Sequence, residues 1–443
     1  MRKILALWLA VSSAGCSAAV SGAGVSPAAA VPYASLPSPG KYIKHVVIVI
    51  QENRTFENIF AGYPGANAPM LGRTSNGKRV ALHQITFHAY DFSHSWRTAL
   101  LDYDHGRMDG FNLNLSIPKS GPLAPYAYLD RTEVAPYWTM AQQYVLADAM
   151  FPTQFGPSFT AHLDLIAATA KLAPNLAEVN SPTSGSSWGC DAPAGTTTAT
   201  VSARRQVSTN GPFPCFNQFA SMANTLDQTY TSWKFYAPRL RSNGGIWSTF
   251  SSIRRVRYGR DWKRVITPQT KVLADAKAGK LASVTWVVPD AKDSDHPAVA
   301  SDKGPSWVAS VVNAVGEGPD WKTSAIVIVW DDWGGWYDNA KPPQLDYLGL
   351  GIRVPCLIIS PYVHAGYVSH TQYEFGSILR FVEDTFGLPA LGPPSMYTDR
   401  RGNSIVDAFD FTQKPRAFTP IPAPYPPDYF LTRPPSGLAP DND

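Results

Sequence analysis

Two pairs of polar residues follow closely on apolar runs and offer oxygen atoms to a cation. Glu52 and Asn53 come just after the run HVVIVI, and Asp331 and Asp332 come directly after the run AIVIVW. A lone acid after a strand usually ends the strand or caps a turn, but two tandem pairs favour a functional site. Three carboxylates brought together would repel one another without a cation. We therefore predict that these four residues hold one divalent metal ion. Oxygen ligands suit Ca²⁺, Mg²⁺ or Mn²⁺, and zinc and iron are also compatible.

A serine at the predicted start of a helix is a candidate nucleophile. Ser158 follows the tight-turn pair Gly156-Pro157 and precedes a helical pattern over residues 159–172. The position is that of an N-cap, and an N-cap serine usually serves only the helix. A helix N-terminus also attracts anions, so a serine there, beside a metal, is placed to attack phosphorus. Both roles for Ser158 stay open on this pattern alone.

Two histidines in polar loops are candidates for binding a phosphoryl oxygen or protonating a leaving group. They are His94, within DFSHSW, and His296, within DSDHP. Most loop histidines are only solvated, so each is a weak signal taken singly. His162 lies four residues after Ser158 on the same helical face, and we expect at most a supporting role for it.

Four apolar runs are expected to form the strands that position these residues. They are rich in β-branched residues and bounded by turn residues, which is typical of parallel strands buried on both faces. Helical spacing lies between them, over residues 159–172, 306–315 and 377–386. We therefore predict a three-layer α/β/α sandwich with a mostly parallel central sheet, in which ligands bind beyond the carboxyl ends of the strands. The four runs are 45–50, 284–288, 325–330 and 354–359.

The composition fits one large domain with insertions. The 443 residues are 44% hydrophobic, enough for a sizeable core, and only 16% are charged. The 39 prolines and 33 glycines exclude a coiled coil or a helical repeat. The 38 basic and 34 acidic residues nearly balance without a Lys/Arg block, which argues against a nucleic-acid partner. We expect a catalytic domain over 41–413, with an inserted loop at 184–215 and a proline-rich C-terminal extension at 414–443.

The N-terminus predicts an exported protein, periplasmic or secreted. A basic start and a short apolar run precede an Ala/Ser/Gly-rich stretch, which is typical of a signal peptide or leader over residues 1–30. The stretch 13–16 resembles a lipoprotein cleavage box, so lipid anchoring through Cys16 and ordinary cleavage both stay open. In an oxidising compartment Cys190 and Cys215 are expected to form a disulfide, and Cys356 a buried thiol.

Five ordered blocks of the sequence closely resemble those of the phosphoesterase family that contains bacterial and plant non-specific phospholipases C and secreted acid phosphatases. The resemblance covers roughly residues 42 to 390. The strongest block is HVVIVIQENRTFENIF, and the others follow in the expected chain order. They are residues 94–96 with 108–111, residues 156–159, residues 295–297 with 331–338, and residues 353–355 with 360–361 and 377–381.

The resemblance implies an alkaline-phosphatase-like fold and one catalytic metal. By matching positions, the resemblance implies that the two polar pairs are the metal ligands and that Ser158 is the nucleophile, which also touches the metal. The ligands would be Glu52, Asn53, Asp331 and Asp332. The two loop histidines would contact phosphate or act as acids. Asp332 stands where many members have glutamate, and Asn339 where many have histidine. Ser158 stands where phospholipases C commonly have threonine. The pattern in which His162 follows this serine by four residues resembles the acid-phosphatase branch more closely.

The expected reaction is hydrolysis of a phosphoric ester through a phosphoseryl intermediate. The first interpretation is a phospholipase C-like phosphodiesterase that acts on a phospholipid headgroup, with aromatic residues such as Trp336 providing an apolar approach and peripheral membrane contact. The alternative is a secreted acid phosphatase acting on small phosphate monoesters, with Arg54, Arg97 or Arg107 on a cationic rim. A third interpretation is a non-catalytic surface protein that binds phosphate or phospholipid. The sequence predicts no oligomeric state.

Overall fold

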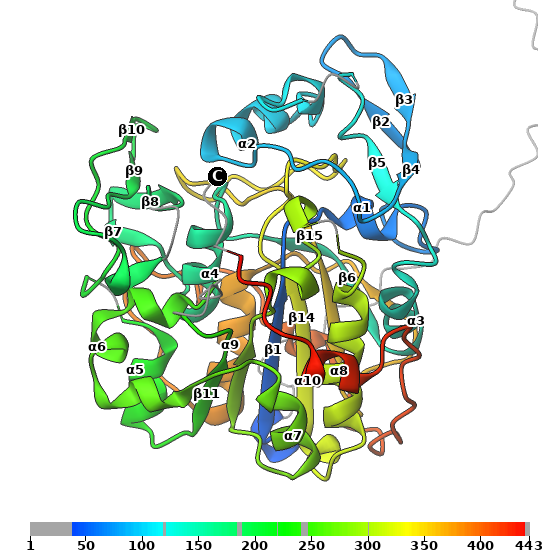
Figure 1. Ribbon diagram of the computed structural model, residues 1–443, viewed down its shortest axis with the longest axis vertical. Helices are drawn as coiled ribbons and strands as arrows, with labels where there is room; N and C mark the ends of the chain where they lie inside the picture. The colour runs from blue at the N-terminus through cyan, green and yellow to red at the C-terminus, as the bar shows by residue number, and fades with distance from the viewer. Residues whose placement is uncertain are drawn as a thin grey trace, which may run out of the picture. The chain divides into compact units, whose positions relative to one another are not determined.

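A central mixed sheet carries the apolar runs of the sequence in the computed structural model (Figure 1). The structure describes residues 38–117, 121–183, 188–218, 220–240, 247–299 and 301–438, which belong to one compact unit. The predicted leader and Cys16 lie outside the described residues. Within those residues, none of the helices has the length and apolar character needed to cross a membrane.

The sheet runs in the order β12-β11-β13-β1-β14-β15-β6-β16, and β17 also pairs with β6. The strands from β12 to β14 are parallel to one another, as are β16 and β17 to β6. Only β15 runs antiparallel to both of its neighbours. All four predicted runs are strands, and the prediction of a mostly parallel sheet is confirmed. The bounds are β1 His45–Gln51, β6 Val145–Phe151, β11 Trp233–Tyr236, β12 Val265–Ile266, β13 Val284–Val287, β14 Ser324–Trp330, β15 Val354–Ile359, β16 Tyr367–Ser369 and β17 Tyr373–Glu374.

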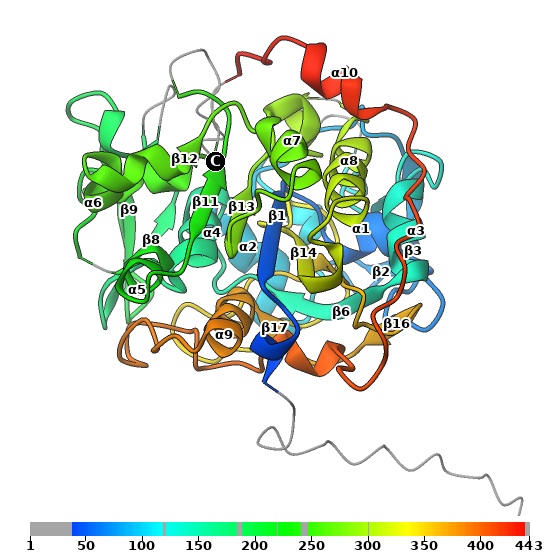
Figure 2. The same ribbon diagram turned by 90° about the horizontal axis from the view of Figure 1, so that it is seen from below.

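Helices cover both faces of this sheet, which confirms the three-layer prediction. Figure 2 shows α7 and α8 on one side of β1 and β14, and α9 on the other. Helix α8 is apolar and almost wholly buried, as a helix between the sheet and an outer segment must be. The main helices are α3 Ala135–Gln143, α4 Ser158–Ala167, α5 Met222–Gln228, α6 Arg254–Arg257, α7 Lys271–Lys277, α8 Gly304–Gly316 and α9 Phe375–Phe386.

Helix α4 differs from its predicted bounds at both ends. Pro157 has extended backbone angles and occupies the N-cap, so Ser158 is the first helical residue and not the cap. At the other end Ala168 adopts a left-handed conformation with φ of 50°, which stops the helix well before residue 172. The hydroxyl of Ser158 therefore does not cap its own helix.

Smaller elements surround the sheet. Strands β7 Lys171–Ala173, β8 Leu176–Asn180, β9 Ala199–Ser202 and β10 Val207–Ser208 form an antiparallel sheet. Two of these strands lie within residues 184–215, where the sequence pattern had indicated only a loop. Other elements follow β1 along the chain: α1 Phe56–Phe60, β2 Leu71–Arg73, β3 Arg79–Ala81, β4 His83–Ile85, α2 Trp96–Tyr103 and β5 Ala127–Leu129.

The C-terminal segment packs along α8. The side chain of Asn313 exchanges two hydrogen bonds with the backbone of Ile421, at 2.9 and 2.8 Å. Further along, helix α10 (Pro427–Thr432) places Phe430 against Trp307, with ring centroids 5.5 Å apart. These contacts hold the proline-rich end of the described chain against the outer surface of a core helix.

The predicted disulfide between Cys190 and Cys215 is present, and Cys356 is a buried free thiol. Residues next to the two bridged cysteines pack on helix α4, because the rings of Trp188 and Phe216 lie 5.2 and 6.2 Å from that of Phe159. The bridge thus fastens a long excursion of the chain to the helix that carries Ser158.

Loss of this disulfide should lower the free energy of unfolding by about 3 kcal/mol, since it closes a loop of 25 residues in the unfolded chain. The measurement is urea unfolding of the double variant C190S/C215S beside the oxidised wild type. Reduced wild-type protein is the control, because it loses the bridge without any substitution. Equal stability of all three forms would contradict the expectation.

Candidate active site

The two polar pairs, Glu52-Asn53 and Asp331-Asp332, meet at one edge of the sheet because β1 and β14 are neighbours in parallel register. Gln51 pairs with Trp330 at the ends of the two strands, so Glu52 and Asp331 leave the sheet at the same level. The backbone N–H of Asp331 donates to the carbonyl of Gln51 at 3.0 Å. Glu52 and Asp331 are both fully buried. The expected convergence of the two pairs is therefore present in the structure.

Asp331 also holds the two turns together. Its Oδ1 accepts hydrogen bonds from the backbone N–H groups of Asn53, at 2.9 Å, and of Asp332, at 2.7 Å. Asn53 is left-handed, with φ of 57°, and so is Gly334, with φ of 61°. A Cβ atom at position 334 would lie 2.3 Å from the carbonyl oxygen of Asn53. The first glycine of the Gly-Gly pair is therefore required for the close approach of the two turns.

Ser158 faces the second acid of the β14 pair. Its hydroxyl donates to Oδ2 of Asp332 at 3.1 Å and accepts from Nδ2 of Asn53 at 3.3 Å. The same Nδ2 lies 2.8 Å from Nε2 of His94, and all four residues are fully buried. The structure thus brings the predicted nucleophile, one predicted histidine and two of the predicted metal ligands into one hydrogen-bonded cluster. Asn53 turns its amide nitrogen to this cluster, whereas a metal ligand would use its oxygen.

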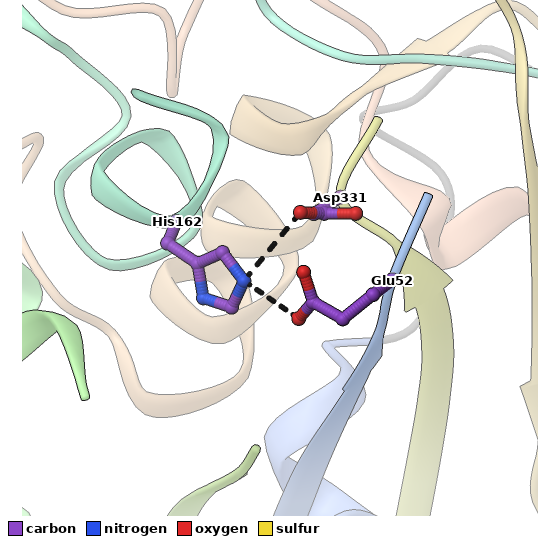
Figure 3. A group of neighbouring side chains, drawn as sticks. All are labelled: Glu52, His162 and Asp331. Carbon is purple, nitrogen blue, oxygen red and sulfur yellow. Dashed lines mark hydrogen bonds and ion pairs between the residues drawn. The ribbon is translucent and has the colours of Figure 1, made fainter. Parts of the chain in front are cut away.

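The other two predicted ligands meet a histidine that sequence reasoning did not assign. Nε2 of His162 lies 2.9 Å from Oε1 of Glu52 and 3.7 Å from Oδ2 of Asp331 (Figure 3). One donor atom from each of the three residues lies within 4.8 Å of the others. The only available signal was the spacing of four residues between Ser158 and His162 on one helical face.

This group has the chemistry of a divalent-metal site. Burial lowers the pKa of His162 to about 4, against the opposing effect of the Asp331 carboxylate, so the imidazole is neutral at neutral pH. Oδ2 of Asp331 accepts no hydrogen bond from the described residues. Two buried carboxylates and one imidazole are side chains that commonly bind a divalent cation together.

The second predicted histidine, His296, lies beside His94 in the site. Its ring lies 6.1 Å from that of His94, whose Nδ1 is fixed at 2.8 Å from the carbonyl oxygen of Phe92. Trp247 stacks on His296 at 5.9 Å and on His162 at 6.3 Å, so one indole aligns both imidazoles. Trp247 carried no signal in the sequence, because it reaches the site from a distant, irregular part of the chain.

Asp295 anchors His296 from beneath the site. Its backbone is left-handed, with φ of 72°, and its carboxylate is fully buried in the protein. There Oδ2 accepts hydrogen bonds from the hydroxyl of Tyr137 at 2.7 Å and from Nε1 of Trp330 at 3.1 Å. Burial raises the pKa of Asp295 to about 7. Since Trp330 directly precedes Asp331, this carboxylate links the histidine loop to the acidic pair of β14.

Removing the hydroxyl in the variant Y137F should therefore lower kcat by about 10-fold to 100-fold while leaving KM and metal content nearly unchanged. Tyr137 touches no part of the predicted reacting group, so the loss would come from displacement of His296. The measurement is steady-state kinetics with metal analysis. The matched control is Y144F, at the end of the same helix α3. An equal loss in both variants would indicate general destabilisation instead.

Residues 43–389 match the model of the Phosphoesterase family. The chain belongs to the phosphoesterase family. This confirms the resemblance found in the sequence blocks, and it makes the protein a hydrolase that acts on phosphoester bonds.

Several named relatives of this phosphoesterase are phospholipases C. Phospholipase C A of Mycobacterium tuberculosis is 24% identical over 88% of this chain and 81% of its own length. The non-hemolytic phospholipase C of Pseudomonas aeruginosa is 24% identical over 84% of this chain and 58% of its own. Non-specific phospholipase C6 of Arabidopsis thaliana is 30% identical over 27% of this chain and 29% of its own. Among solved structures, a protein in the alkaline phosphatase superfamily from Vibrio parahaemolyticus covers 83% of this chain and 72% of its own, with a TM-score of 0.38 and 10% identity.

Proposed function

We propose that this protein is a metal-dependent phosphodiesterase of the phospholipase C type that uses Ser158 as its nucleophile. The observation that carries the proposal is the hydrogen bond from the Ser158 hydroxyl to Asp332, beside the buried group of Glu52, His162 and Asp331. The similarity to phospholipases C supports a phospholipid as the substrate.

Each residue of the site has a separate role in the proposed reaction. The hydrogen bond to Asp332 directs the Ser158 proton away from the oxygen lone pair that attacks phosphorus. Asn53 and His94, which belong to the same hydrogen-bonded cluster as the serine and Asp332, would contact a phosphoryl oxygen. A divalent cation held by Glu52 and its acidic neighbours would offset their charge and stabilise charge on the phosphoryl oxygens.

Turnover requires two displacements at phosphorus. In the first, the bond from Ser158 Oγ to phosphorus forms and the bond to the alcohol oxygen breaks. His296 or His94 gives the alcohol oxygen its proton, and the Ser158 proton passes to Asp332. In the second, water attacks phosphorus and gives its proton to the imidazole that lost one, the bond from Ser158 Oγ to phosphorus breaks, and Asp332 returns the proton to Ser158. The rings of His94 and His296 are neighbours, so either imidazole can protonate the departing alcohol and then accept a proton from the attacking water.

Two of the three candidate rim arginines are engaged elsewhere, which supports a diester over a monoester substrate. A phosphomonoesterase must balance an additional negative charge, for which Arg54, Arg97 and Arg107 are the candidates, and of these Arg97 is exposed on α2. Arg54 is fully buried instead, donating to the carbonyl of Asp295 and lying 5.2 Å from the ring of Trp336. Arg107 forms ion pairs with Asp104 and Asp109. The aromatic rings around His94 and His296 suit an apolar substrate better than a second phosphate charge.

The test compares hydrolysis of phosphatidylcholine with that of p-nitrophenyl phosphate, with and without a chelator. We expect release of diacylglycerol, loss of this activity on chelation, and its recovery when one of Mn²⁺, Zn²⁺, Ca²⁺ or Mg²⁺ is returned. Faster hydrolysis of the monoester would favour the acid-phosphatase alternative. Binding of vesicles without hydrolysis of either ester would contradict an enzymatic role.

A further inference from the structure

We infer that His162 is a direct ligand of the catalytic cation, so that the metal is bound through nitrogen as well as oxygen. The inference rests on the metal dependence in the proposed function and goes beyond the all-oxygen ligand set that the strand ends predict. It assigns a role in metal binding to the face of helix α4 that also carries Ser158.

The separations between the donor atoms fit one small cation. Ligand atoms bound at about 2.1 Å lie about 3.0 Å apart in octahedral and about 3.4 Å apart in tetrahedral geometry. Nε2 of His162 lies 2.9 Å from Oε1 of Glu52 and 3.7 Å from Oδ2 of Asp331. Figure 3 shows this nitrogen directed at both carboxylates. The two separations from Nε2 are thus close to the spacing that a shared ion imposes, and the two carboxylate oxygens lie within 4.8 Å of each other.

Charge gives a second, independent reason. The two fully buried carboxylates of Glu52 and Asp331 converge on one imidazole nitrogen, and two negative charges held this close together are unfavourable unless a cation lies between them. A single N–H also serves only one of two acceptors well, and Oδ2 of Asp331 has no hydrogen-bond donor among the described residues. A cation shared by the three side chains removes both costs.

The surroundings of His162 hold its ring in this position. The ring lies between Trp188, at 6.1 Å, and Trp247, at 6.3 Å with planes 9° apart. Nδ1 makes no hydrogen bond to the described residues, so no donor among them keeps the ring proton off Nδ1. When a cation takes the place of the proton that Nε2 shares with Glu52, this nitrogen can offer it a lone pair.

The inference predicts which cations the site selects. Ca²⁺ and Mg²⁺ prefer oxygen ligands, whereas imidazole suits zinc, iron and related transition metals. We therefore expect the full-length protein to bind Zn²⁺ more tightly than Ca²⁺. The variant H162Q should lose this preference, with its Zn²⁺ affinity reduced about 100-fold and its Ca²⁺ affinity far less.

The decisive measurement is anomalous diffraction from crystals of the wild-type protein loaded with Zn²⁺, which needs no variant to fold. An ion about 2.0 to 2.1 Å from Nε2 of His162 would support the inference. An ion bound elsewhere in the cluster, beyond bonding distance of Nε2, would overturn it. The affinities of H162Q are compared with those of H45Q, which changes a histidine at the opposite end of the strand that precedes Glu52. Equal Zn²⁺ losses in the two variants would likewise overturn the role of His162.

Failure of this inference differs from failure of the proposed function. If hydrolysis survives complete removal of metal, the proposed metal dependence is wrong. If hydrolysis needs the metal and the bound ion does not contact Nε2, only the role of His162 is wrong.

Discussion

Replacing Ser158 by alanine should reduce kcat for phosphatidylcholine by about 10⁴-fold or more while the protein stays folded and keeps its metal. Ser158 is fully buried at the start of α4, and its hydroxyl bonds Asp332 instead of capping the helix. Its loss therefore removes the attacking oxygen without removing a capping interaction. The measurement combines initial rates with metal analysis and thermal unfolding of the same sample.

The matched control for this serine is Thr160, in the same helical turn. The hydroxyl of Thr160 donates to the carbonyl of Pro157 at 3.0 Å and belongs to the helix start. The variant T160S keeps that donor and should leave kcat nearly unchanged. Substantial activity in S158A would show that the attack on phosphorus comes from another group, such as water.

Changing Asp331 to asparagine should remove metal and activity together, with a loss of about 10³-fold or more in kcat. The substitution is selective, because an asparagine oxygen still accepts from the backbone N–H groups of Asn53 and Asp332. Only the charge and Oδ2, the atom that faces His162, are lost. The fold should therefore survive while the cation site does not.

This second variant is tested by metal analysis after dialysis, with near-ultraviolet circular dichroism to confirm the fold. D320N is the control, since Asp320 lies just before the opposite end of β14 and forms only a partly exposed ion pair with His45. Full metal occupancy in D331N would contradict the role of Asp331 as a ligand.

Features encoded within a few neighbouring residues were predictable from the sequence. The buried strands that lead to Glu52 and Asp331 could be identified because an apolar run is followed by an acid within two residues in each case. The position of Ser158 followed from a Gly-Pro turn before a helical pattern. The antiparallel direction of β15 was not predictable, since its apolar run VPCLII resembles those of its parallel neighbours.

Features that depend on distant contacts were missed. The bond from Tyr137 to Asp295 joins residues 158 positions apart, and the contact of His162 with Glu52 joins residues 110 apart. Arg54 illustrates the converse error. It stands beside the acidic pair in the sequence and was a candidate for a substrate-binding rim, yet it is buried against Trp336. Sequence proximity to a site does not fix the direction of a side chain.

The register of β1 with β14 has a practical consequence for altering substrate preference. Neighbouring strands lie about 4.8 Å apart, a spacing set by their backbone hydrogen bonds and not by the loops above them. Glu52 and Asp331 inherit that spacing, so the distance between the starts of these two turns depends on the sheet and not on the outer loops. Libraries that randomise residues 88–91, none of which is buried, and leave 52–53 and 331–335 untouched should therefore yield folded, metal-loaded enzymes with new headgroup preferences.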